Sequence, residues 1–180
     1  MIRLARATVP GGRRVDVDVD AGTGRIAAVA PAGTSPVGPD TTVEPLDGYL
    51  LLPAPAEPHA HLDKALVGER VPNPTGDLAG AIVAWCDHRG TQTVDDIVVR
   101  AREAALLCVA AGATAVRTHV DVGGDIGLRA VEALVCVRDE LAPLLDLQIV
   151  ALIGLPLSGS LGAPNRKLHV AALVAGADLV

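Results

Sequence analysis

Two histidines separated by a single residue, His59 and His61, are the strongest chemical signal in the sequence. In an extended chain, side chains two residues apart lie on the same face, about 6–7 Å apart at the backbone. Two imidazoles placed in this way can approach one metal ion at about 2.0–2.1 Å each. Glu57 and Asp63 follow the same alternation as the two histidines, so four polar side chains share a face that would be apolar in a buried strand. We therefore predict that His59 and His61 bind a metal, the alternative being two surface histidines in a loop.

A second group of polar residues occurs in segment 114–122. Its alternation predicts a strand with Arg117, His119 and Asp121 on one face and apolar residues on the other. A strand of a parallel sheet normally buries both faces, so a polar face indicates a nearby reaction site. We expect these three residues and Asp63 to contact the substrate or to support the metal ligands. Alternatively, Arg117 pairs with Asp121, and Asp63 forms a surface pair with its neighbour Lys64.

Helices and apolar strands alternate after residue 50. Strands are predicted at 114–122, at 147–153 and from 178 onward, and helices at 77–89, 93–112, 126–141 and 165–175, the last capped by Asn165. Connections of this length between strands imply right-handed crossovers and a parallel sheet. A closed (β/α)8 barrel takes about 250 residues. Residues 53–180 are therefore predicted to form the first half of such a barrel, an α/β fold.

Residues 1–52 have a different pattern, with short strands separated by glycine-rich and proline-rich turns. Val15, Val17 and Val19 alternate with aspartates, which predicts one buried and one solvated face. So little chain is insufficient for an independent sandwich. We predict a partial β-sandwich of antiparallel strands over residues 1–52.

Composition excludes several classes of function. The net charge of −6, without blocks of like charge, and the single Trp and single Tyr argue against nucleic-acid binding. No apolar run reaches the 18 residues of a membrane span, and the charged N-terminus lacks the apolar core of a signal peptide, so secretion is not expected. Cys86, Cys108 and Cys136 are predicted to be buried free thiols, typical of a cytoplasmic protein.

Three segments, residues 52–64, 116–122 and 145–151, resemble the amidohydrolase superfamily, and most closely its cytosine deaminase branch. The resemblance implies a mononuclear zinc or iron ion that activates water for attack on a ring carbon bearing an amine. His59 and His61 match the first two metal ligands of that branch. The remaining ligands and a proton-shuttling Glu are expected beyond Val180. Cytosine deaminases carry a Gln that binds the pyrimidine, and in this sequence Gly154 stands near that position. Because glycine has no side chain to replace this hydrogen bond, we expect a substrate other than cytosine.

The expected function is therefore hydrolysis of a C–N bond in a cyclic amine or pyrimidine-like small molecule. The chain is expected to be truncated and inactive alone. One alternative is a non-catalytic half-barrel that binds metal weakly or assembles with a partner chain, including a second copy of itself. Another is a cyclic-amide hydrolase of the same superfamily.

Overall fold

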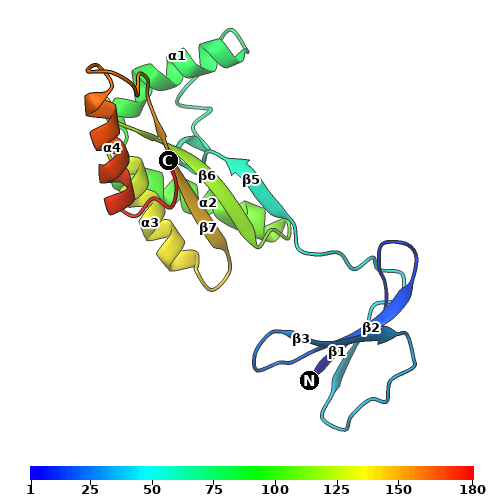
Figure 1. Ribbon diagram of the computed structural model, residues 1–180. Helices are drawn as coiled ribbons and strands as arrows, with labels where there is room; N and C mark the ends of the chain where they lie inside the picture. Colours follow the sequence, from blue (N-terminus) through cyan, green and yellow to red (C-terminus); the bar gives the residue numbers. More distant parts are fainter. The chain divides into compact units, whose positions relative to one another are not determined.

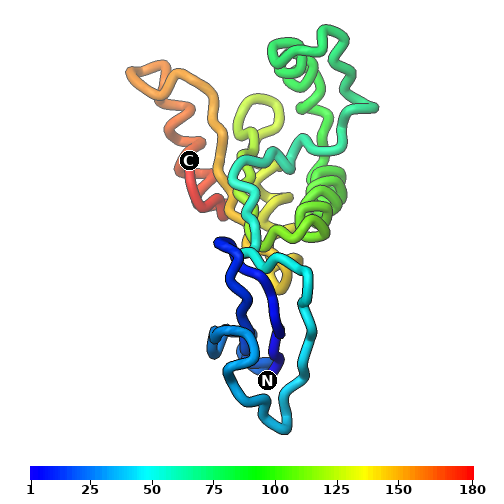
Figure 2. Tube along the Cα trace, turned by 90° about the vertical axis from the view of Figure 1, so that its right-hand side faces the viewer, coloured from blue at the N-terminus to red at the C-terminus, as the bar shows by residue number.

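The computed structural model describes all 180 residues, which form two compact units, Met1–Pro53 and Ala54–Val180 (Figure 1; the Cα trace is shown in Figure 2). The sequence changes character close to this division, from turn-rich short strands to alternating helices and strands. None of the helices is both long enough and apolar enough to cross a membrane.

The first unit is a four-stranded sheet in the order β3-β2-β1-β4. Its strands are β1 (Ile2–Thr8), β2 (Arg14–Val19), β3 (Ile26–Pro31) and β4 (Thr42–Pro45). Three of them are antiparallel neighbours, but β4 pairs with β1 in parallel, so the prediction of antiparallel strands throughout is wrong. The long connection between β3 and β4 returns the chain to run in the same direction as β1.

The predicted alternation in β2 is only partly correct. Val15 and Val17 are buried, as expected, but Asp16 is buried as well. Its carboxylate accepts hydrogen bonds from the backbone N–H groups of Gly33 and Arg6, both at 2.8 Å. These two bonds lower the pKa of Asp16. The aspartate therefore connects the turn at Gly33 to strand β1 rather than facing solvent.

The second unit has a parallel three-stranded sheet in the order β5-β6-β7. Its elements are β5 (Ala56–Ala60), η1 (Leu62–Lys64), α1 (Leu78–His88), η2 (Arg89–Thr91), α2 (Val94–Ala110), β6 (Ala115–Val122), α3 (Arg129–Leu141), β7 (Asp146–Ile153) and α4 (Ala163–Val174). A parallel bridge between Val150 and Leu179 begins a further pairing on the outer side of β7. Helices separate consecutive strands, as the sequence predicted.

Local signals determine where the helices begin and end. Thr93 caps α2 by accepting a hydrogen bond from the Asp96 backbone N–H at 3.2 Å. For α4 the predicted cap, Asn165, is wrong: the helix begins at Ala163, and the Asn165 amide donates to the Pro156 carbonyl instead. Pro164 explains the earlier start, because proline fits the first helical turn, where its missing N–H is not needed.

One face of the sheet is packed against α2, α3 and α4. Its core contains fully buried residues from each layer, among them Ile97, Ala101, Val120, Leu134, Ile149 and Ala172. The prediction of three buried thiols is wrong for Cys86 and Cys136, which are exposed, and Cys108 is half-buried. Both exposed cysteines lie on helix faces that turn away from the core.

Candidate metal and substrate site

Three histidine rings gather where β5 ends, on the face of the sheet that no helix covers. The rings of His59 and His119 are stacked with centroids 4.3 Å apart, and His61 lies 5.2 Å from His59 and 5.8 Å from His119. Parallel pairing of β5 with β6 brings these residues together, although 58 positions separate His61 from His119 in the chain. The two predicted metal-ligand positions and the predicted His119 therefore form one cluster.

The ring of His61 is held in an orientation suited to a metal ligand. Its Nδ1 lies 2.9 Å from the backbone carbonyl oxygen of His119, which can only accept a hydrogen bond. Nδ1 therefore carries the proton and donates, so Nε2 keeps a free lone pair. A backbone carbonyl on the second ring nitrogen is the usual support of a metal-binding histidine.

His59 and Glu57 are both exposed, but they have different roles. The Glu57 carboxylate accepts a hydrogen bond from the His59 backbone N–H at 2.9 Å, so it braces the strand end instead of joining the imidazoles. The His59 ring remains free to bind. Of the four residues predicted to share one face, only His59 and His61 present side chains to the cluster.

His119 is half-buried, and its Nδ1 is enclosed without a hydrogen-bond partner. Burial, together with the nearby His59 and His61, lowers its pKa, so the neutral imidazole is favoured. Neutral imidazoles are the form that binds metals. The residues fit a metal that needs histidine donors, although no group of three or more His, Cys, Asp or Glu side chains is arranged to hold an ion.

Asp63 does not lie on the strand face with the histidines, because the chain turns into η1 at Leu62. The predicted alternative of a pair with Lys64 is correct in its partner, with Lys64 Nζ 3.5 Å from Asp63 Oδ2, but wrong in placing Asp63 at the surface, because this side chain is completely buried. Its Oδ2 accepts the backbone N–H of Asp121 at 3.0 Å, while Oδ1 has no hydrogen-bond partner. Burial raises the pKa of this carboxyl group. Asp63 therefore links the turn after His61 to strand β6.

Asp121 is the centre of a buried network that the sequence did not reveal. Its Oδ1 accepts from Lys64 Nζ at 2.6 Å, and its Oδ2 accepts from the indole N–H of Trp85 at 2.7 Å, with Arg89 Nη1 at 3.7 Å. The predicted alternative of an Arg117–Asp121 pair is wrong. The one available signal was Trp85 itself, because a buried indole N–H needs an acceptor.

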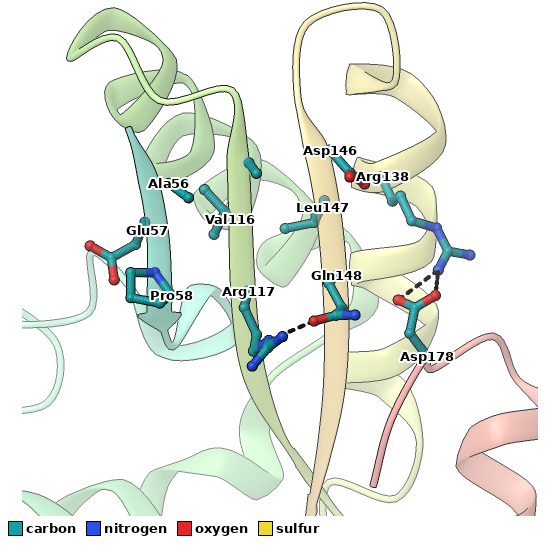
Figure 3. Close-up of a pocket in the computed structure, with 11 residues that line it drawn as sticks. Ala56, Glu57, Pro58, Val116, Arg117, Arg138, Asp146, Leu147, Gln148 and Asp178 are labelled. Atoms are coloured by element: carbon teal, nitrogen blue, oxygen red, sulfur yellow. Dashed lines mark hydrogen bonds and ion pairs between the residues drawn. The ribbon is translucent and has the colours of Figure 1, made fainter. Parts of the chain in front are cut away.

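Two of the cavities on the second unit lie at opposite ends of its strands. One, of about 590 Å³, is lined by His61, Lys64, Trp85 and Asp121 together with apolar residues from α1 and from the end of β7. The other, of about 550 Å³, lies near the strand beginnings (Figure 3). There Arg117 donates to Gln148 at 2.5 Å, so Arg117 lies outside the cavity that contains His61.

The chain is similar to known enzymes. It is 31% identical over 139 residues to a pterin deaminase of Rhizobium rhizogenes, a match that covers 77% of this chain and 31% of the relative. It is 34% identical over 111 residues to an N-isopropylammelide isopropyl amidohydrolase of Pseudomonas sp., which covers 58% of this chain and 27% of the relative. No family model matches the chain.

Among solved structures, a 5-methylcytosine deaminase from Klebsiella pneumoniae, liganded with 5-fluorocytosine, superposes with a TM-score of 0.79 at 32% identity. The match covers 99% of this chain and 42% of the deaminase. The chain thus spans about a third of the length of the curated relatives it matches. These matches confirm the resemblance predicted from residues 52–64, 116–122 and 145–151, and they confirm a mixed α/β fold.

Proposed function

We propose that this chain, whose relatives are amidohydrolase-family deaminases, is part of a metal-dependent hydrolase that cleaves a C–N bond in a cyclic amine. In this proposal residues 53–180 form the first half of a (β/α)8 barrel, and residues 1–52 form part of a flanking β-sandwich. The observation that carries the proposal is the pairing of His59 with His61, whose Nδ1–H is fixed on the His119 carbonyl.

His59 and His61 would hold a zinc or iron ion through their free ring nitrogens. Such an ion would lower the pKa of a bound water to about 7, which would supply a nucleophile at neutral pH. The His119 ring packs against His59 and restricts its rotation, while its backbone carbonyl fixes His61. Two histidines are fewer than the three protein ligands typical of catalytic zinc, so further ligands belong to chain segments outside these residues.

Neither Asp121 nor Asp63 can transfer protons to a substrate. Both oxygens of Asp121 already accept hydrogen bonds, from Lys64 and from Trp85. Asp63 is completely buried behind the turn that follows His61. The general acid–base group that a deamination requires is therefore proposed to lie in the same further segments, beyond Val180.

The proposed substrate is a small ring bearing an exocyclic amine. The similar enzymes are named for pterin, 5-methylcytosine and N-isopropylammelide. The cavity that includes His61 has about 590 Å³, within the range of about 300–1,000 Å³ typical of small-molecule sites. A pyrimidine, triazine or pterin ring fits that volume.

The decisive experiment measures ammonia release by the full gene product that contains these residues, on a panel of aminopyrimidines, aminotriazines and pterins. His59→Gln and His61→Gln should each lower kcat/KM by roughly 1,000-fold or more, equivalent to about 4 kcal/mol of transition-state stabilisation. His169→Gln, which removes a half-buried histidine from α4, is the matched control and should keep activity within about twofold.

Metal content tests the same site independently. The 180-residue chain should bind Zn²⁺ in competition with a chelating dye, and each of the two variants should weaken binding at least tenfold. Undiminished metal binding and turnover in both variants would refute the proposal. Ring opening without ammonia release would instead identify a cyclic-amide hydrolase.

A further inference from the structure

Helix α1 is attached to the rest of its unit by few contacts. Of its eleven residues only Trp85 is buried, whereas α2 buries four residues and α3 buries six. Leu78, Ile82 and Val83 expose 76%, 54% and 60% of their surfaces. A helix with so little buried apolar area depends on its polar attachments for a fixed position.

The main polar attachment is the carboxylate of Asp121 at the end of β6. It binds the Trp85 indole N–H on one oxygen and Lys64 Nζ on the other, at 2.7 and 2.6 Å. The Lys64 ammonium also lies 5.4 Å from the centroid of the Trp85 ring. A charged acceptor for a buried indole is worth about 1.5–3 kcal/mol, comparable to burying one large side chain. Asp121 thus holds α1 and the turn after His61 at the same point.

The apolar face of α1 lines the cavity that contains His61. Leu78, Ile82 and Trp85 are spaced four and three positions apart, which places them on one side of the helix. All three border the cavity of about 590 Å³, and Leu155, 83% exposed, lines it from beyond β7. An apolar surface of this kind, next to a polar cluster, is typical of a ligand pocket.

We propose that Asp121 is a positioning residue: by holding Trp85 and Lys64 it seats α1 as the apolar wall of the substrate pocket, and so selects cyclic amines that carry an apolar substituent. This inference rests on the proposed function for its substrate. The attachment of α1 itself does not depend on that function and can be tested separately.

The attachment is tested on the 180-residue chain through Trp85, the single tryptophan of the sequence. Asp121→Asn should shift Trp85 emission to the red and increase its quenching by acrylamide. It should also speed amide hydrogen exchange in α1 at least tenfold, with α2 and α3 unchanged. Asp125→Asn is the matched control, because Asp125 binds Arg89 Nε at 3.1 Å but touches neither Trp85 nor Lys64. Unchanged exchange in α1 of Asp121→Asn would overturn the attachment.

The pocket wall is tested on the full gene product with two probes, cytosine and 5-ethylcytosine. The ethyl-bearing ring should bind about tenfold better, as expected for two additional buried carbon groups. Asp121→Asn and Trp85→Phe should reduce this preference to within about twofold by raising KM for 5-ethylcytosine while kcat changes little. Trp85→Phe keeps an aromatic ring in the core but removes the N–H donor and part of the ring volume, and it covers the case in which Asp121→Asn fails to fold.

The outcomes separate the two proposals. If neither ring is hydrolysed, their affinities are compared by titration calorimetry, which also serves for Trp85→Phe, with Asp125→Asn as the control for Asp121→Asn. If Asp121→Asn loses the preference for 5-ethylcytosine and Asp125→Asn keeps it, the role of α1 as the pocket wall is supported even though no deamination is observed. An unchanged preference in both Asp121→Asn and Trp85→Phe, with α1 loosened, would refute the role in selection.

Discussion

The two faces of the β5-β6-β7 sheet differ sharply in chemistry. On the face covered by helices, Val116, Thr118 and Val120 of β6 are at most 2% exposed. On the open face the same strand presents Arg117 and His119, and its neighbour β7 presents Gln148 (Figure 3). Because strand side chains alternate in direction, one strand serves both faces.

This difference separates stability from chemistry within each strand. The covered face removes apolar area from water, which is the main source of folding free energy. The open face contributes little burial, so its residues are free to be polar and to bind ligands. Substitutions at neighbouring positions of one strand should therefore have very different effects, according to the face on which they fall.

The largest expected effect compares two leucines of β7. Leu147 is 2% exposed on the covered face, and Leu152 is 47% exposed on the other. Leu147→Ala should lower the free energy of unfolding by about 2–5 kcal/mol, because it leaves a cavity in the core. Leu152→Ala, the same chemical change, should cost less than about 1 kcal/mol. Urea unfolding followed by Trp85 fluorescence reports on this unit, and equal losses would contradict the separation of the faces.

A smaller effect is expected at Arg100, a charged residue buried beneath the cluster. Its guanidinium donates to the carbonyl oxygens of Asp63 and Ala65 at 3.0 and 2.7 Å, and so fixes the turn that follows His61. Arg100→Met keeps the aliphatic stem but leaves these acceptors unpaired, which should cost about 1–3 kcal/mol. Zn²⁺ affinity should fall as well, because the turn orients His61.

Arg102→Met is the control for Arg100→Met. Arg102 lies two residues further along α2 and pairs with Glu140 at the surface, where both side chains are about half exposed. Exposed ion pairs contribute about 0–1 kcal/mol. If the two variants lose the same stability, the buried position of Arg100 has no special role.

The sequence was informative wherever local periodicity determines structure. The alternation in 114–122 and the helical signals around Thr93 correctly predicted β6 and α2. The His59-x-His61 spacing predicted two side chains on one face, which the ring geometry shows. These features depend on neighbours within a few residues, which is the range that patterns in a sequence can express.

Predictions failed where the outcome depended on distant partners. Asp63 was assigned to the strand face because alternation was continued past His61, but η1 intervenes and buries the side chain under β6. Arg117 was paired with Asp121 on the same strand, whereas Asp121 is occupied by Lys64 and Trp85 from other elements. The competing donors lie 57 and 36 residues away, beyond any local pattern.

The smallest expected effect concerns pH and His119 on the open face. Burial and the neighbouring His59 and His61 lower its pKa in the folded chain, so the unfolded chain binds the proton more readily. Stability should therefore be fully present above the unfolded pKa of about 6.5, and it should decline as the pH falls through 6.5 toward the lowered folded value. His119→Gln should remove this part of the decline, measured as the difference between wild type and variant in urea unfolding at pH 7.5 and pH 5.

His169→Gln controls for the loss of one imidazole elsewhere. Because His119 is only half-buried, solvent screens its interactions, and the effect should be smaller than those at Leu147 and Arg100. A decline that persists unchanged in His119→Gln would show that the open-face cluster is not where protons destabilise the fold.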